Sequence, residues 1–588
     1  MGRVYRADLD AIKGLAIIAV VFYHMGLLNS GYLGVDAFFV INGFFIIPSM
    51  IKLFESNSLS TGKELFLFCE KRLMRLWPLI LIATSFCLLV GYIGMLPDDY
   101  ENLSESVIAS NLFSENILSA ITTKNYWDIS NDYKPLMHMW YVGVLVEFYL
   151  ITPLLLWCTA KIANGIKLSY VKALKFVVIL LTLLSFFYYL SPLSSGPGRF
   201  YFLPSRFWEI ALGGIVAFYI DDIRYKELIN RKVLNTLFTI LFLGLLCLGL
   251  FWPTFMPIPA LLLTAFTTAY LLCANPAKSL FSNTLNWKPL CFLGRMSFSV
   301  FVWHQILLAF YRYYYSDNIT IVFSVLFWIA TLGISYLSYI YVEQKVKVTH
   351  RTFVVTAVLM LAILMPSIAI YYHAGVVRDV PEMNIYFDDV HKGMHAEYVD
   401  RVYKMDKDFT NDGRIKVLVV GDSFARDWVN VLLESSINDS LDITYAFSYS
   451  ERLIPRIKEC DLLFSRGLKA AIPEYVWSAI KERKVWGIGT KTFGNSNGII
   501  YARRHKANYF ETSIIPKQKF VDQRETERYQ WKDHYVDMMS PCMNSDGSVR
   551  VFTPSNKYIS QDCTHLTEDG AKYYAEQINF LRIFKSTE

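Results

Sequence analysis

The sequence predicts a polytopic α-helical membrane bundle, of about ten helices plus an eleventh linking span, followed by an α/β domain with a mainly parallel sheet. Hydrophobic residues make up 54% of the 588 residues and aromatic residues 16%, which is high for a soluble chain. The excess lies in the first ~375 residues, where apolar runs of about 17 to 25 residues recur, long enough to cross a hydrocarbon core of about 30 Å. From about Val376 onward no such run occurs, and charged residues become dense. The composition therefore divides the chain into a membrane part and a folded C-terminal domain.

We divide the chain into a transmembrane domain (1–345), a linking transmembrane helix (346–375), a linker or extension (376–410) and the C-terminal domain (411–588). Candidate spans begin near residues 14, 34, 76, 139, 175, 206, 235, 257, 296, 319 and 352. Their number is odd, so the two ends of the chain lie on opposite sides of the membrane. Lys and Arg gather in the loops of one side, whereas the opposite segment 97–135 is acidic. The positive-inside rule then predicts a cytoplasmic N-terminus and an extracytoplasmic C-terminal domain.

The formal net charge of +6 is explained by these basic loops, so we expect no nucleic-acid partner. Of nine cysteines, only Cys460, Cys542 and Cys563 lie in the C-terminal domain. An oxidising compartment would permit a disulfide there. We expect Cys542 to pair with Cys563 and Cys460 to stay free, although spacing alone does not fix the pairing.

The first span carries Lys13 and His24 on one apolar helix. Eleven residues separate them by about 16 Å and place both near one helix face. They could line one path through half of the bilayer, since ionisable residues inside a span are costly and usually functional. Alternatively, Lys13 is an interfacial anchor and His24 a packing histidine.

Two further sites in the bundle each allow two interpretations. Asp36 opens the second span, where it could hold the imidazole of His24, or could simply be favoured by a helix N-terminus. Arg72 and Arg75 are three residues apart on one helix face and could clamp a phosphate or pyrophosphate. Positive-inside anchoring explains the same basic cluster.

Other polar residues also fall within predicted spans. Arg206 and Glu209, three residues apart, could form an intrahelical ion pair. The remaining candidates are His138, Trp140, His304 and Glu343.

In the C-terminal domain, the β-prone run 415–420 is followed by Gly421-Asp422-Ser423 and then a helical pattern. This order predicts a strand, a tight turn and a helix, which would present Ser423 where backbone N–H groups can stabilise an oxyanion. An ordinary N-cap turn is the alternative. About 140 residues later, Asp562 precedes His565 by three residues. A carboxylate so placed can hold the imidazole while its other nitrogen faces a serine.

The ordered motifs of residues 5–345 resemble those of the acyltransferase-3 family of integral-membrane O-acyltransferases. These motifs are Tyr5-Arg-Ala-Asp-Leu-Asp-Ala-Ile-Lys13 with His24, Gly34-Val-Asp-Ala-Phe-Phe-Val-Ile-Asn-Gly43, Arg72-Leu-Met-Arg75-Leu-Trp-Pro78 and Gly294-Arg-Met-Ser-Phe-Ser-Val-Phe-Val-Trp-His304. The resemblance implies that the bundle takes acyl groups, usually acetyl from cytoplasmic acetyl-CoA, towards acceptors beyond the membrane. It implies that His24 is the acyl-transfer residue or base. It also implies that Lys13, Arg72 and Arg75 bind the donor.

The chain departs from the family pattern at three positions. Lys13 stands where the family usually has Arg, which keeps the charge but loses the bidentate fork. Asn42 replaces the usual Ser. Glu147 lies two positions later than the usual carboxylate, a shift of about 200° on a helix, so it is not assigned that carboxylate's role.

The chain order Ser423, Asp562, His565 resembles the SGNH hydrolase family over residues 410–588. The resemblance implies a nucleophilic Ser423, activated by His565 and oriented by Asp562. It makes the loop 489–498 the candidate for the oxyanion-hole asparagine, Asn495 first and Asn497 second. An exposed polar turn is the alternative for this loop, and the second-block Gly of the family is not evident.

Together these features predict a membrane O-acyltransferase of the bacterial inner membrane, with Asp36, Arg206, Glu209, His304 and Glu343 in supporting roles. It would move acetyl from acetyl-CoA to hydroxyls of an extracytoplasmic bacterial glycan, foremost lipopolysaccharide O-antigen or another surface polysaccharide, with peptidoglycan also open. We expect no metal cofactor, and the oligomeric state is left open. The alternatives are a membrane-anchored carbohydrate esterase, a glycan or lipid transporter with an accessory domain, and a glycan sensor.

Overall fold

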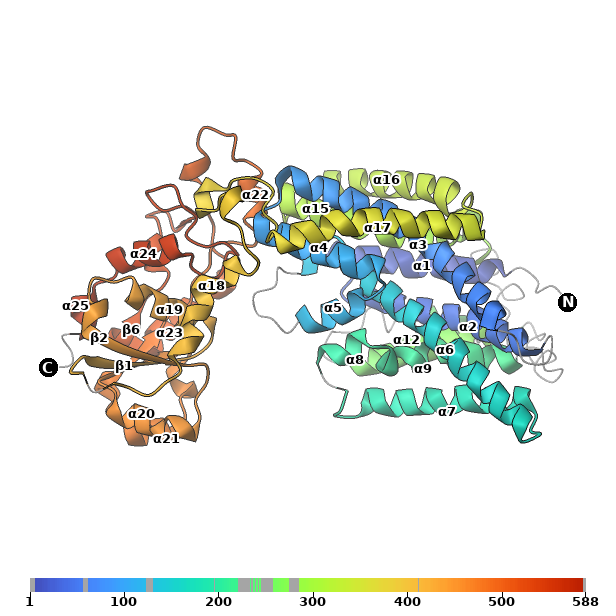
Figure 1. Ribbon diagram of the computed structural model, residues 1–588, viewed down its shortest axis with the longest axis horizontal. Coiled ribbons are helices and arrows are strands. Elements are labelled where there is room, and N and C mark those ends of the chain that lie inside the picture. Colours follow the sequence, from blue (N-terminus) through green and yellow to red (C-terminus); the bar gives the residue numbers. More distant parts are fainter. Residues whose placement is uncertain are drawn as a thin grey trace. The chain divides into compact units, whose positions relative to one another are not determined.

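The computed structural model describes residues 6–584 apart from 56–61, 123–130, 195, 274–284, 411 and most of 220–256. It contains two compact units (Figure 1). The first comprises Met1–Gly91 and Leu103–Ile368, and the second comprises Tyr92–Asn102 and Ala369–Glu588.

The first unit is helical, as predicted. Within the described part of the chain, six helices are long and apolar enough to cross a membrane, or seven if the pair α14 and α15, bent by 71°, counts as one span. The span predicted near residue 235 falls largely outside the described residues. The helices that lie wholly or mostly in this unit are α1 (Ala7–His24), α2 (Gly34–Glu55), α3 (Gly62–Gly94), α4 (Pro97–Asn111), α5 (Glu115–Thr122), α6 (Met139–Gly165), α7 (Tyr170–Leu190), α8 (Pro197–Tyr201), α9 (Leu203–Tyr219), α12 (Pro257–Cys273), α14 (Lys288–Arg295), α15 (Ser297–Tyr314), α16 (Ile321–Ser338) and α17 (His350–Tyr372).

Glycines let several of these helices approach closely. A Cβ at Gly43 of α2 would lie 1.6 Å from the carbonyl oxygen of Ile210 in α9. Likewise, a Cβ at Gly294 of α14 would lie 1.7 Å from the carbonyl oxygen of Asp10 in α1. Small residues at helix contacts are the usual device for close packing in a membrane. Here they bring together the helices that carry the polar residues of the first motifs.

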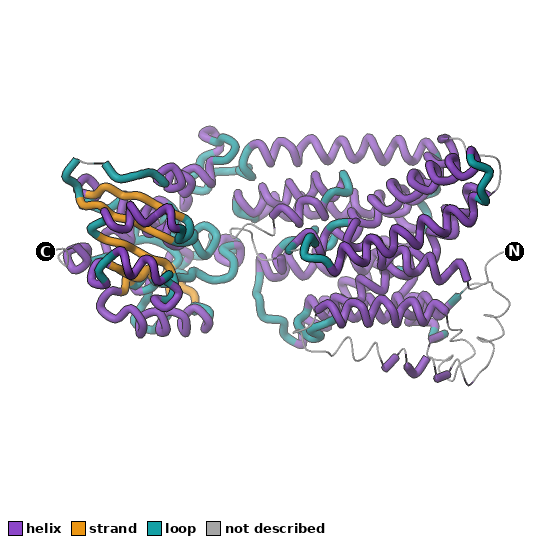
Figure 2. Tube along the Cα trace, turned by 90° about the horizontal axis from the view of Figure 1, so that it is seen from below, coloured by secondary structure: helices purple, strands orange, loops and turns teal. Residues whose placement is uncertain are grey.

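The second unit is built on a parallel sheet, drawn in orange in Figure 2. Its strand order is β2-β1-β3-β4-β6, and all four pairings are parallel. A short antiparallel pair, β5 and β7, stands apart from it. The predicted mainly parallel sheet is therefore confirmed. The strands are β1 (Ile415–Val420), β2 (Leu441–Ala446), β3 (Leu462–Arg466), β4 (Val485–Ile488), β5 (Ser513–Ile514), β6 (Tyr535–Val536) and β7 (Val549–Arg550).

Helices cover both faces of this sheet (Figure 1). On one face, Val417 and Val419 pack with residues of α19 (Ser423–Leu433) and α24 (Glu568–Gln577). On the other, Leu418 and Val420 pack with residues of α20 (Ile454–Glu459) and α21 (Glu474–Ala479). A strand buried on both faces reads as a continuous apolar run, which explains the sequence of β1.

The remaining helices of the unit are α18 (Met394–Asp400), α22 (Gly498–Tyr501), α23 (Gln518–Trp531) and α25 (Phe580–Phe584). The second unit also includes a segment from early in the chain. Leu96, between α3 and α4, packs with Val376 and Tyr501 in one apolar cluster. The predicted linker joins the same unit, where the Nδ1 atom of His395 lies 2.7 Å from an oxygen of Asp98. The linker is thus packed against the start of α4.

Candidate active sites

Ser423, His565 and Asp562 meet in the second unit. The Nε2 atom of His565 lies 2.8 Å from the Oγ atom of Ser423, and its Nδ1 atom contacts Oδ2 of Asp562. The structure therefore brings together the three residues that the sequence singled out, in the arrangement of a nucleophile, a base and an orienting carboxylate.

The turn after β1 positions the serine. The φ angle of Gly421 is 146°, and a Cβ there would lie 2.4 Å from the Cβ of Arg466, so the turn needs glycine. Asp422 caps α19 by accepting a hydrogen bond from the N–H of Phe424 at 3.0 Å. Ser423 is the first residue of this helix, where free N–H groups and the helix dipole favour a developing negative charge.

A second turn orients the imidazole. Oδ1 of Asp562 accepts hydrogen bonds from the N–H groups of Thr564 at 2.9 Å and His565 at 2.7 Å. Burial raises the pKa of Asp562, but the nearby His565 and these hydrogen bonds outweigh it and hold that pKa below its usual value. Cys563 adopts a φ of 65° within this turn, a costly conformation for a non-glycine residue.

The loop 489–498 supports this turn through Asn497. Its buried amide nitrogen donates hydrogen bonds to the carbonyl oxygens of Ser560 at 2.6 Å and Gln561 at 2.8 Å. Its Oδ1 atom accepts one from the thiol of Cys563 at 3.1 Å. In this structure, then, the amide of Asn497 holds the turn that carries Asp562 and His565. Asn495, the first choice for the oxyanion hole, is exposed.

A buried ion pair beside the triad was not predicted. Nζ of Lys491 lies 2.7 Å from Oδ2 of Asp427, and both side chains are at most 1% exposed. The same oxygen accepts a hydrogen bond from the N–H of Leu566 at 3.0 Å. Burial lowers the pKa of Lys491 despite the attraction of Asp427. The pair joins α19, the loop after β4 and the residue that follows His565. In the sequence, the only indication of this pair was that Asp427 follows Ser423 by four residues, which is about one helical turn.

The predicted disulfide is wrong. Cys542 and Cys563 are both free, buried thiols. The thiol of Cys563 is directed to Asn497, whereas Cys542 lies beside Tyr574. Each thiol therefore has its own packing environment. The expectation that Cys460 stays free is confirmed.

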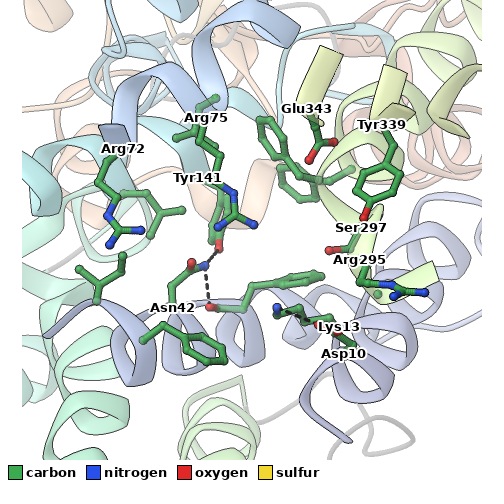
Figure 3. Close-up of a pocket in the computed structure, with 18 of the residues that line it drawn as sticks. Asp10, Lys13, Asn42, Arg72, Arg75, Tyr141, Arg295, Ser297, Tyr339 and Glu343 are labelled. Atoms are coloured by element: carbon green, nitrogen blue, oxygen red, sulfur yellow. Dashed lines mark hydrogen bonds and ion pairs between the residues drawn. The ribbon is translucent and has the colours of Figure 1, made fainter. Parts of the chain in front are cut away.

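In the first unit, Lys13, Arg72 and Arg75 line one pocket of about 530 Å³ (Figure 3). Arg295 adds a fourth cation, and Asp10 and Glu343 supply two carboxylates. The lining therefore has a surplus of two positive charges, which suits an anionic ligand. The sequence had not singled out Arg295 as a site residue.

Some polar side chains of the pocket are hydrogen-bonded within the protein, and one has an unused donor. Nζ of Lys13 lies 3.3 Å from Oδ1 of Asp10, and the amide of Asn42 donates to the hydroxyl of Tyr141 at 2.8 Å. Glu343, in the π-helical turn η4 (Tyr339–Glu343), accepts a hydrogen bond from Ser299. In contrast, the buried Nε atom of Arg72 has no hydrogen-bond partner among the described residues. That arginine keeps donor capacity for a ligand.

His24 lies with two other histidines rather than in the pocket. The ring centroid of His24 is 4.4 Å from that of His138 and 5.7 Å from that of His304. The pocket and this cluster share Phe301, which lines the pocket and lies 5.0 Å from His138.

Asp36 pairs with Arg206 rather than with His24. An oxygen of Asp36 lies 3.1 Å from Nη1 of Arg206, and Oε1 of Glu209 lies 2.8 Å from the same nitrogen. The predicted intrahelical pair of Arg206 and Glu209 is confirmed. Of the two interpretations of Asp36, the contact with His24 is not formed, whereas Asp36 does lie in the first turn of α2. The guanidinium of Arg206 stabilises its buried carboxylate. Oε1 of Glu147 accepts from the amide of Asn116 at 2.8 Å.

Comparison with known proteins identifies the bundle. The family described as "Acyltransferase domain" matches residues 6–340. This chain belongs to that family. Its helical unit is therefore an acyltransferase domain, in agreement with the resemblance seen in the motifs.

Named relatives agree with this assignment. The O-acetyltransferase OatA of Staphylococcus aureus is 27% identical over 363 residues, which cover 58% of this chain and 57% of the relative. The peptidoglycan O-acetyltransferase OatA of Listeria monocytogenes is 28% identical over 318 residues, which cover 51% and 49%. The match thus spans about half of each relative's length. No solved structure matches the chain.

Proposed function

We propose that this protein is a membrane O-acyltransferase that moves acetyl groups to hydroxyls of an extracytoplasmic bacterial glycan. The observation that carries the proposal is the contact of Ser423 with His565 and of His565 with Asp562, in a chain whose bundle belongs to an acyltransferase family. An acyltransferase bundle supplies an acyl group, and a triad can accept one and pass it on.

The triad's chemistry follows from its geometry. Oγ of Ser423 attacks the acyl carbonyl while Nε2 of His565 takes the serine proton. The tetrahedral intermediate collapses to an ester on Ser423, and the leaving group takes the proton from His565. The acceptor hydroxyl then attacks this ester and gives its proton to His565. Oγ of Ser423 leaves and recovers that proton. Asp562 stabilises the imidazolium in both steps.

The donor in this proposal is cytoplasmic acetyl-CoA, bound in the pocket of Figure 3. Its phosphates match the surplus positive charge from Lys13, Arg72, Arg75 and Arg295. The bundle's part in transfer also requires His24, which lies against His138, a neighbour of the pocket-lining residue Phe301. The protein would lie in the inner membrane with its N-terminus in the cytoplasm and its triad outside.

The acceptor in this proposal is a cell-surface glycan. Lipopolysaccharide O-antigen or another surface polysaccharide is the class expected from the sequence. The name of the Listeria relative instead specifies peptidoglycan for that protein. Both classes carry the sugar hydroxyls that the triad needs.

The test follows labelled acetyl from acetyl-CoA, supplied to inside-out membrane vesicles, into separately purified lipopolysaccharide and peptidoglycan. We expect label in one fraction for the parent chain and none for Ser423→Ala or His24→Ala. The matched controls are Ser440→Ala and His350→Ala, both at exposed positions. Full labelling of the glycan by Ser423→Ala would show that this serine takes no part in the transfer. Loss of acetyl from a pre-acetylated glycan, without any gain, would identify an esterase instead.

A further inference from the structure

Three histidines from distant parts of the chain converge inside the bundle. His24 ends α1, His138 immediately precedes α6, and His304 lies within α15. The ring centroids of His138 and His304 are 4.9 Å apart, and His24 lies against both. The three residues are 8%, 3% and 0% exposed, respectively. Three polar rings in one buried place need a physical reason.

The hydrogen bonds leave nitrogens unused. Nδ1 of His304 lies 2.9 Å from the carbonyl oxygen of Val300, so it carries the proton and donates it. Nε2 of His304 then presents a lone pair. Among the described residues, neither this atom nor Nε2 of His138 has a hydrogen-bond partner. Burying such an atom without a partner is unfavourable. A backbone carbonyl that fixes the far nitrogen is also the usual support of a metal-bound histidine.

We propose that His24, His138 and His304 bind one divalent transition-metal ion, with Zn²⁺ as the first candidate. Each residue offers a ligand nitrogen, and these atoms lie within 4.8 Å of one another. Zinc bonded to nitrogen at about 2.0–2.1 Å in tetrahedral geometry needs nitrogens about 3.3 Å apart. The rings therefore move inward by about 1 Å or less on binding, within the reach of small side-chain rotations.

The ligand chemistry restricts the ion. Imidazole suits zinc, copper, nickel and iron, whereas magnesium and calcium need oxygen ligands, and this group contains three histidines and no carboxylate. Three protein ligands leave a fourth position open, as in catalytic zinc sites. Arg312 places a positive charge near the three histidines, since it donates a hydrogen bond to the carbonyl oxygen of His24 at 2.6 Å. Its pairing with Asp132, 3.4 Å away, offsets part of that charge.

The inference goes beyond the proposed function, because metal binding does not require acyl transfer. It departs from the expectation of no metal cofactor, and in it His24 is a ligand instead of a base. An ion here would act as a Lewis acid close to Phe301, the ring shared with the pocket.

The test measures metal in the purified full chain. The protein is prepared in detergent through an affinity tag without histidine, incubated with Zn²⁺ and freed of excess metal. Elemental mass spectrometry should then find about one zinc per chain, the value for a single site. We expect His24→Ala, His138→Ala and His304→Ala each to lose most of it. His534→Ala, which alters a histidine held against the carbonyl oxygen of Val485 at 3.0 Å, should retain it.

Two measurements separate loss of metal from loss of fold. His304→Gln keeps a polar side chain of similar size but is a poor ligand, so it should lose zinc while the chain stays monodisperse and Ser423 still reacts with a serine-directed probe. Cobalt bound to the parent chain should give the visible bands of a tetrahedral site, absent from this variant. Less than about a tenth of an ion per chain, or equal zinc in parent and variants, overturns the site. Glycan acetylation by metal-free protein would also remove the ion from the reaction and leave the proposed function intact.

Discussion

Replacing Asn497 by alanine should loosen the turn that carries Asp562 and His565. The amide nitrogen of Asn497 donates to the carbonyls of Ser560 and Gln561 at 2.6 and 2.8 Å, and the site is only 3% exposed. Alanine removes both hydrogen bonds and leaves one buried and one partly buried carbonyl group without this donor.

The expected cost follows from these bonds. Each buried acceptor left unsatisfied costs about 1–3 kcal/mol, of which entering water recovers part. We therefore expect the turn to lose about 2–4 kcal/mol against local opening. Because about 1.4 kcal/mol is tenfold in an equilibrium constant, backbone amides of residues 559–567 should exchange roughly 30- to 1000-fold faster.

Hydrogen exchange of the full chain, read by mass spectrometry, measures this directly. Asn495→Ala, two residues away and exposed, is the matched variant and should leave exchange of 559–567 unchanged. Labelling of Ser423 by a serine-directed probe should slow in Asn497→Ala because His565 is less well held. Slow labelling with normal exchange would refute this reasoning and support a direct oxyanion role for Asn497.

Three further predictions concern the triad, its buried ion pair and the pocket. The pKa of Asp562 is held below its usual value, so its carboxylate stabilises the fold fully above the unfolded pKa of about 3.9, and this stabilisation is lost as pH falls through the lower folded pKa. The difference in thermal unfolding temperature between the parent and Asp562→Asn should therefore vanish at that low pH, and a difference that stays constant with pH would contradict this. Lys491→Met leaves Asp427 buried without its cation and should cost about 3–5 kcal/mol in denaturant unfolding, part of which Asp427→Asn in the same chain should restore; equal loss in both would exclude the pairing. Arg72→Ala should weaken equilibrium binding of coenzyme A about 10- to 100-fold, the worth of one charge-assisted hydrogen bond, whereas the exposed Arg351→Ala should not; unchanged affinity in Arg72→Ala would place the donor elsewhere.

Local patterns in the sequence predicted much of the structure. The apolar run 415–420 followed by Gly-Asp-Ser became a strand, a turn and a helix. The spacing of Asp562 and His565 led to a contact within one turn. Both depend on residues a few positions apart, where backbone geometry dictates which side chains meet.

Contacts between distant segments could not be predicted in the same way. Asp36 has an arginine 170 positions away as its partner, and no local pattern distinguishes this from a contact with His24. The prediction of a disulfide was wrong for the same reason, since a pairing chosen from loop length ignores where each thiol points. The three-histidine cluster joins α1, α15 and the residue before α6, so it exists only in the folded bundle.

The segment around Leu96, where α3 ends and α4 begins, has a practical consequence for anyone who wishes to isolate the triad-bearing unit. Residues Tyr92–Asn102 belong to that unit, and Leu96 fills part of a cluster with Val376 and Tyr501. A fragment cut anywhere between α17 and β1 would therefore lack a piece of its own interior and expose an apolar surface in its place. Soluble versions of this unit will need residues 92–102 supplied, for example as a segment grafted onto the N-terminus of the fragment.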